Sequence, residues 1–117
     1  MTVKECYEFF GGDYADAMSR LAKDERIAKY LRKLPDSRDF DEMNTNLAAG
    51  NWEDAFRNVH NLKGVSLNLG LTPLAEASSA LCETVRHGAP TVDITGMVSD
   101  VKAAYEKILA AIELIDG

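Results

Sequence analysis

The sequence predicts an all-α protein, and three observations support this. Apolar residues recur with helical periodicity through the second half of the chain, Gly and Pro residues divide the chain into segments, and no segment alternates apolar and polar residues as a half-buried strand would. Long amphipathic helices joined by short loops are typical of antiparallel neighbours in a bundle. We therefore expect an antiparallel up-and-down four-helix bundle with short additional N-terminal helices.

Length and composition favour a single domain over residues 1–117, with the core bundle at about 37–116. The chain is 46% hydrophobic and 27% charged, as in ordinary globular proteins, and its net charge is -6. Lys and Arg are scattered and no long apolar run is present, which argues against nucleic-acid binding, secretion and membrane spanning. A cytoplasmic protein with a protein partner is the expectation.

The N-terminal half contains shorter elements. We expect helices near 2–10, 13–34 and 37–49, and the second is either continuous or broken at Lys23-Asp24. The helix at 37–49 is the candidate fourth member of the bundle, because it carries three large apolar residues. These are Phe40, Met43 and Leu47.

The second half predicts three longer helices. Asn51 is a candidate N-cap for a helix over 52–69, and Thr72 is one for a helix over 73–87, with a proline at its first position. The last helix is indicated by a heptad stripe over 94–115, which we interpret as an intramolecular bundle contact in a monomer. The stripe consists of Ile94, Val98, Val101, Tyr105, Ile108, Ile112 and Ile115.

His60 stands apart from the apolar face of its helix. That face is expected to pack in the core, and it consists of Trp52, Ala55, Val59, Leu62, Ser66 and Leu69. At 100° per residue, His60 lies roughly 130° from the centre of this face. Packing therefore does not explain His60, which points largely to solvent.

The residues one turn from His60 form an unusual neighbourhood. Lys63 places a cation where it could balance phosphate charge. Gly64 costs about 1 kcal/mol relative to Ala in a helix interior, which suggests that something approaches the backbone closely there. Phe56 and Leu67 would form an apolar border suited to docking.

These residue types favour phosphohistidine chemistry. A neutral imidazole is a nucleophile at physiological pH, and its second ring nitrogen can be held by a hydrogen bond. The neighbourhood of His60 offers no carboxylate cluster for magnesium, and the chain has no Gly-rich loop for a nucleotide. We therefore expect no cofactor, no metal and no kinase activity of its own, with Mg²⁺ and an acceptor aspartate supplied by the partner.

The run His60-Asn61-Leu62-Lys63-Gly64-Val65-Ser66-Leu67-Asn68-Leu69-Gly70 resembles the H-x-L-K-G-x-S-x-N-L-G signature of the histidine-containing phosphotransfer (HPt) domain family. The resemblance extends onto the next helix through Leu74, Ala77, Leu81 and Glu83, and so covers about 30 residues.

This resemblance implies a four-helix bundle with His60 as phosphoacceptor, Lys63 contacting the phosphoryl group and Gly64 leaving room for it. Partners would be a response-regulator receiver domain, a hybrid histidine kinase, or both. Many members place a glutamine that hydrogen-bonds the histidine where this chain has Cys82, so another residue or water must orient His60. Arg86 matches a basic position of some members and is a second candidate for phosphate contact.

Other interpretations remain open. The surface around His60 could serve a non-phosphorylated interaction module, and the chain could stand alone or form part of a larger hybrid kinase. His87 is interpreted as a C-terminal helix residue, and Cys82 as a packing residue. A zinc site from Cys6, Cys82 and the two histidines is disfavoured because no pair has ligand spacing on one helical turn.

Overall fold

The computed structural model describes residues 1–116, which are all-α as predicted and contain no strand. The sequence predicts six helices, or seven if the segment 13–34 is broken, and the described residues form seven α-helices and one short 3-10 turn. The elements are α1 Val3–Phe10, α2 Tyr14–Leu21, α3 Asp24–Lys33, the turn Leu34–Asp36, α4 Asp39–Ala49, α5 Trp52–Asn68, α6 Thr72–Val85 and α7 Thr95–Ile112.

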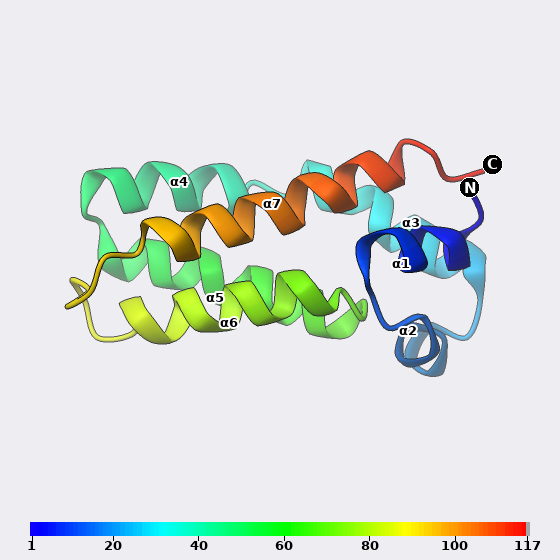
Figure 1. Ribbon diagram of the computed structural model, residues 1–117, viewed down its shortest axis with the longest axis horizontal. Helices are drawn as coiled ribbons and strands as arrows, with labels where there is room; N and C mark the ends of the chain where they lie inside the picture. Colours follow the sequence, from blue (N-terminus) through cyan, green and yellow to red (C-terminus); the bar gives the residue numbers. More distant parts are fainter. Residues whose placement is uncertain (117) are drawn as a thin grey trace.

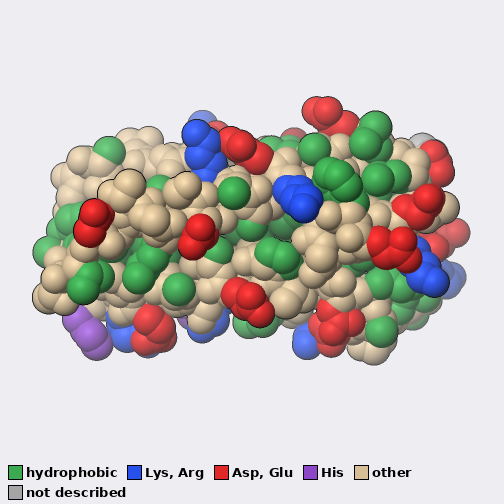
Figure 2. Space-filling view, in the orientation of Figure 1, with side chains coloured by type: hydrophobic (Ala, Val, Ile, Leu, Met, Phe, Trp, Pro, Cys, Tyr) green, Lys and Arg blue, Asp and Glu red, His purple; other side chains and the backbone are tan. Residues whose placement is uncertain are grey.

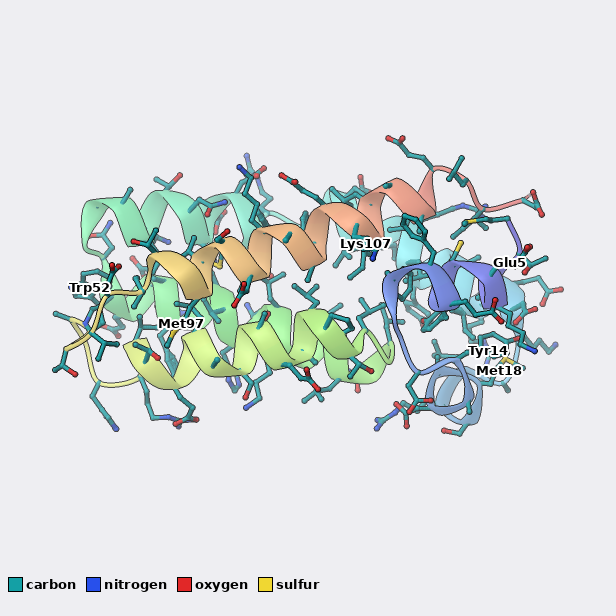
Figure 3. The ribbon with its side chains drawn as sticks, in the orientation of Figure 1. Glu5, Tyr14, Met18, Trp52, Met97 and Lys107 are labelled. Atoms are coloured by element: carbon teal, nitrogen blue, oxygen red, sulfur yellow. The ribbon has the colours of Figure 1, made fainter. Side chains whose placement is uncertain are left out.

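Helices α4 to α7 form the predicted four-helix bundle, and each packs against the next in the chain (Figure 1). The three N-terminal helices lie at one end of the bundle, where α1 and α3 contact α7. The molecule is therefore elongated, with extents of 42 × 22 × 19 Å. Figure 3 shows Trp52 and Met97 at the far end of the bundle, and Glu5, Tyr14 and Met18 in the N-terminal helices.

The predicted segment 13–34 is broken, and the break lies close to Lys23-Asp24. Helix α2 ends at Leu21, and its C-cap Ala22 adopts a left-handed conformation (φ 68°) and donates its N–H to the carbonyl of Met18. Asp24 and Glu25 then occupy the first turn of α3, where carboxylates favour the positive end of the helix dipole. Two short helices can fold around the bundle end, which one straight helix could not.

Asn51 occupies the predicted N-cap position of α5, whereas the predicted cap at Thr72 is wrong. The Asn51 side chain makes no cap bond and instead donates to Oδ1 of Asn46 at 3.4 Å. Thr72 is the first helical residue of α6, so Leu71 occupies the N-cap position. The predicted helix 73–87 ends earlier, at Val85, where the next turn closes with Gly88 N–H donating to the Val85 carbonyl.

The apolar stripes predicted for α5 and α7 face the core. On α5 the residues Ala55, Val59, Leu62, Ser66 and Leu69 are buried, and Trp52 is half-buried against the same cluster. On α7, Val101, Tyr105 and Ile108 are buried, whereas Ile115 packs against the core beyond the helix end. Burial of the α5 residues fixes the rotation of α5 about its own axis and leaves the opposite face of α5 exposed.

The N-terminal helices are tied to the end of α5 by hydrogen bonds. Asp13 N–H donates to the Gly70 carbonyl at 2.8 Å, and the buried Tyr7 hydroxyl donates to the Leu69 carbonyl. Helix α1 is also linked to α7, where Lys107 lies over the ring of Phe9 with 5.3 Å between its Nζ and the ring centroid (Figure 3). The bonds of Tyr7 and Asp13 hold the C-terminal end of α5 from α1 and from the start of α2.

Candidate functional site

His60 lies in the middle of α5 on the face turned away from the core. Its neighbour Val59 is fully buried, whereas His60 is exposed, as the helical wheel predicted. On the visible face of the molecule, histidine atoms appear only along the edge formed by α5 and α6 (Figure 2). Among residues 1–116, no group donates a hydrogen bond to the imidazole or accepts one from it.

The side chains of Phe56 and Arg86 line the groove beside His60. The ring of Phe56, one turn earlier on α5, stacks on the imidazole with centroids 5.7 Å apart and planes 22° apart. The guanidinium carbon of Arg86 lies 5.6 Å from the Phe56 ring centroid. His60, Phe56 and Arg86 line one shallow groove of about 480 Å³, which also includes Glu53, Arg57, Val85 and Gly88.

Arg86 is the residue that follows α6, and it pairs with Glu83 one turn earlier. Its Nε donates to Oε2 of Glu83 at 3.2 Å, and its Nη2 donates to Oε1. The hydrogen bond from Arg86 lowers the pKa of Glu83, and Lys63 lowers it further. Both partners are exposed, so the pair contributes little stability and can open easily.

Lys63 and Gly64 lie one turn after His60 on α5, and Lys63 is on the side toward α6. Lys63 is half-buried, and its ammonium forms no ion pair with any residue in the part of the chain that the structure describes. A Cβ added at Gly64 would meet nothing within 4 Å. The protein's own packing therefore does not require glycine at this position, and the open space lies on the surface beside His60.

Cys82 is fully buried and does not orient His60. Burial raises the pKa of its thiol, and the positive charges of Lys63 and Arg86 partly oppose this. The prediction that Cys82 is a packing residue agrees with its place in the core cluster. Within residues 1–116 the structure also brings no three His, Cys, Asp or Glu side chains together as metal ligands.

The predicted docking residues lie on either side of His60 along α5. Leu67 is 51% exposed, whereas Phe56 is half-buried. Val65, for which the sequence predicts no role, is 40% exposed, but it lines a separate apolar groove with Leu21 and Tyr30 and not the groove of His60. Its large apolar side chain off the predicted core stripe was the signal that could have found it.

Sequence reasoning also missed a polar network that fixes the helix carrying His60. Asn58 is almost completely buried, and it accepts a hydrogen bond from Asn46 at 2.8 Å and donates to Asp39 Oδ1 at 3.1 Å. Asn61, next to His60, donates to the same oxygen of Asp39 at 3.3 Å. These bonds tie α5 to α4 and hold the register of the His60 face.

The fold and this face together define a class of protein: a helical bundle that presents one histidine, with a cation and an open glycine beside it, from the middle of a helix. Comparison with family models gives a match to the Hpt domain over residues 27–113. The chain belongs to the Hpt domain family. Neither the curated proteins nor the solved structures contain a significant match.

Hpt domains transfer phosphoryl groups through a histidine in phosphorelays, they interact there with receiver domains and kinases, and they lack kinase activity of their own. The match begins within α3, so α1 and α2 lie outside it. Over residues 1–116, no helix has the length and apolar character needed to cross a membrane.

Proposed function

We propose that this chain is a phosphocarrier in which His60 accepts a phosphoryl group from a receiver-domain aspartate and donates it onward. One ring nitrogen attacks the phosphorus, the bond from phosphorus to the aspartyl oxygen breaks, and the aspartate leaves as a carboxylate. The other ring nitrogen holds the proton, so the reverse step restores the starting atoms. The exposure of His60 beside an open Gly64 is the observation that carries the proposal.

The neighbours of His60 take distinct roles in this reaction. Lys63 contacts the transferred phosphoryl group, and Arg86 adds a second cation once it releases Glu83. Gly64 leaves space for the partner's reacting loop, while Phe56 and Leu67 provide apolar docking surface. The Mg²⁺ that neutralises the acyl phosphate belongs to the receiver, so this chain needs no metal.

The test is transfer of label from a panel of phosphorylated receiver domains. Wild type should acquire acid-labile, base-stable label, and His60→Gln should acquire none while its helicity and melting temperature stay nearly unchanged. His87→Gln is the matched control, since the chain has 2 histidines and His87 is also exposed. Label that survives in His60→Gln, or disappears in His87→Gln, contradicts the assignment.

A folded wild type that binds receivers but is labelled by none would favour the alternative, an interaction module without phosphorylation. A large loss of stability in His60→Gln would show instead that His60 is structural. The same panel identifies the receiver with the fastest transfer, which is the candidate for the physiological partner.

A further inference from the structure

Phosphoryl transfer requires that the attacking nitrogen of His60 be held, because misorientation of a reacting group by about 1 Å can cost two orders of magnitude in rate. Nothing in residues 1–116 hydrogen-bonds this imidazole. The side chain of Cys82 on the neighbouring helix α6 is fully buried in the core cluster and makes no hydrogen bond to the ring. Some other contact must restrict the ring.

The aromatic contact with Phe56 has the geometry for this task. The two rings are nearly parallel, at 22°, and 5.7 Å separates their centroids. Residues four apart on a helix share a face, so the contact is maintained by the backbone of α5 itself. An offset, near-parallel ring pair restricts rotation of the smaller ring, although it supplies no proton donor or acceptor.

Phe56 is itself held from the neighbouring helix. Arg86 places its guanidinium carbon 5.6 Å from the Phe56 ring centroid, a cation–π distance, and in this position it donates two hydrogen bonds to Glu83. Contacts therefore run from Glu83 through Arg86 and Phe56 to His60. They span the groove between α5 and the end of α6, on the side where His60 is reached from solvent.

We propose that Phe56 is the positioning residue of His60, and that Arg86 holds Phe56 in place through its cation–π contact. This inference rests on the phosphotransfer function proposed above and adds how the histidine is oriented. Stacking on the Phe56 ring thus takes the place of a hydrogen bond in orienting the imidazole of His60. It leaves both ring nitrogens free of protein partners, so that the nitrogen opposite the phosphoryl group can exchange its proton with solvent.

A purely docking role for Phe56 makes different predictions, and the chain allows the two to be separated. Phe56→Leu keeps an apolar side chain of similar reach but removes the ring, whereas Phe56→Tyr keeps the ring. A docking role depends on apolar area and should be largely preserved in the Leu variant. A positioning role depends on the ring and should be lost with Leu and restored with Tyr.

The first measurement is NMR of the two histidine rings in the unphosphorylated protein, which needs no phosphodonor. The carbon-bound ring protons of His60 should carry a ring-current shift that disappears in Phe56→Leu and is retained in Phe56→Tyr. The signals of His87 should not move in either variant. Unchanged His60 signals in a folded Phe56→Leu variant would overturn the proposal, whatever the protein does with phosphate.

The second measurement separates rate from binding. With the best receiver of the panel at saturation, Phe56→Leu should slow transfer by about three- to tenfold, the range expected from an aromatic pair, while the Kd for the receiver changes less than twofold. Labelling with phosphoramidate, a small donor without a docking surface, should slow by a similar factor. A variant that raises Kd but leaves the saturated rate and the phosphoramidate rate unchanged would make Phe56 a docking residue only.

Arg86→Met tests the support for Phe56. It keeps an unbranched side chain but removes the cation, so the His60 ring-current shift should decrease without vanishing. In a Phe56→Leu background the same change should have no further effect on that shift, because the contact through which Arg86 acts is already absent. Independent, additive effects would show that Arg86 does not act through Phe56.

Discussion

Gly64 and Gly70 lie six positions apart in the same signature, yet they occupy opposite environments. A Cβ at Gly64 would meet no atom within 4 Å, whereas a Cβ at Gly70 would lie 2.5 Å from the carbonyl oxygen of Asp13. Gly70 also has a positive φ of 64°, and Gly64 lies within the regular helix α5. One glycine is required by the fold, and the other is not.

The two glycines mark two parts of the α5 region, one that is packed for folding and one that is open to a partner. At its C-terminal end, contacts with the Tyr7 hydroxyl and the Asp13 N–H leave no space, and the chain is fixed. Around His60, more than two turns earlier, the surface is open, and the ammonium of Lys63 has no ion-pair partner in residues 1–116. A sequence motif alone does not reveal which of its residues serve folding and which serve a partner; the local space does.

The largest effect is expected for Gly70→Ala. The methyl group would collide with the backbone of Asp13, and a left-handed conformation is unfavourable for alanine, so we expect a loss of about 2–4 kcal/mol in the free energy of unfolding. Chemical denaturation measures this. Gly50→Ala is the control, since Gly50 has a similar φ of 75° but no close contact below 3.9 Å, and it should cost only about 1–2 kcal/mol.

Equal losses in the two variants would show that packing of the α5–α6 turn against Asp13 contributes nothing beyond backbone strain. A smaller loss for Gly70→Ala than for Gly50→Ala would mean that the N-terminal helices move aside without cost. Either result would remove the contrast between the closed and the open part of α5.

Tyr7→Phe tests the packed C-terminal end of α5 by removing one hydrogen bond. The variant leaves the buried Leu69 carbonyl without its donor and should cost about 1–2 kcal/mol in the free energy of unfolding at neutral pH. Transfer through His60 should be unaffected, because the site is more than two turns away along α5. A change in transfer rate larger than the change in stability explains would connect the two regions.

The pH dependence of this variant is a further prediction. Burial raises the pKa of Tyr7, so above about pH 10 the unfolded chain releases a proton that the folded protein keeps. The free energy of unfolding of the wild type should therefore fall as pH rises above 10, and less steeply in Tyr7→Phe. Parallel pH profiles measured by denaturation from pH 8 to 11 would contradict this.

The features that could be predicted from the sequence are those that follow the helical spacing of apolar residues. The stripes of α5 and α7 were visible in the sequence because burial of a helix face imposes a regular spacing of apolar residues. The same geometry placed His60 on the exposed face. Asn51 takes the predicted N-cap position, but its side chain bonds to Asn46 on another helix instead of making the local cap bond, and no local pattern reports such a partner.

Contacts between distant segments could not be predicted. The burial of Asn58 depends on Asp39 and Asn46 of α4, and the placement of Arg86 beside Phe56 depends on how α6 packs on α5. From the sequence, Phe56 is predicted to be a docking residue, because the sequence shows only its neighbours on the same helix. Its stacking with His60 was within reach, since the two residues are four apart, but the support from Arg86 was not.

The smallest change in stability, and the sharpest test of the open region, is expected for Gly64. Because a Cβ there meets nothing, Gly64→Ala should raise the free energy of unfolding by about 1 kcal/mol, the helix-propensity difference. Gly64→Gln should also fold, yet it should slow transfer from a receiver by obstructing close approach beside His60. Gly96→Gln, at a helical glycine of α7 with equally open surroundings, is the control and should leave transfer unchanged. Because Gly64→Gln leaves the fold intact, a transfer rate equal to that of wild type would mean that no partner uses this space, and the cost of glycine in α5 would then need another explanation.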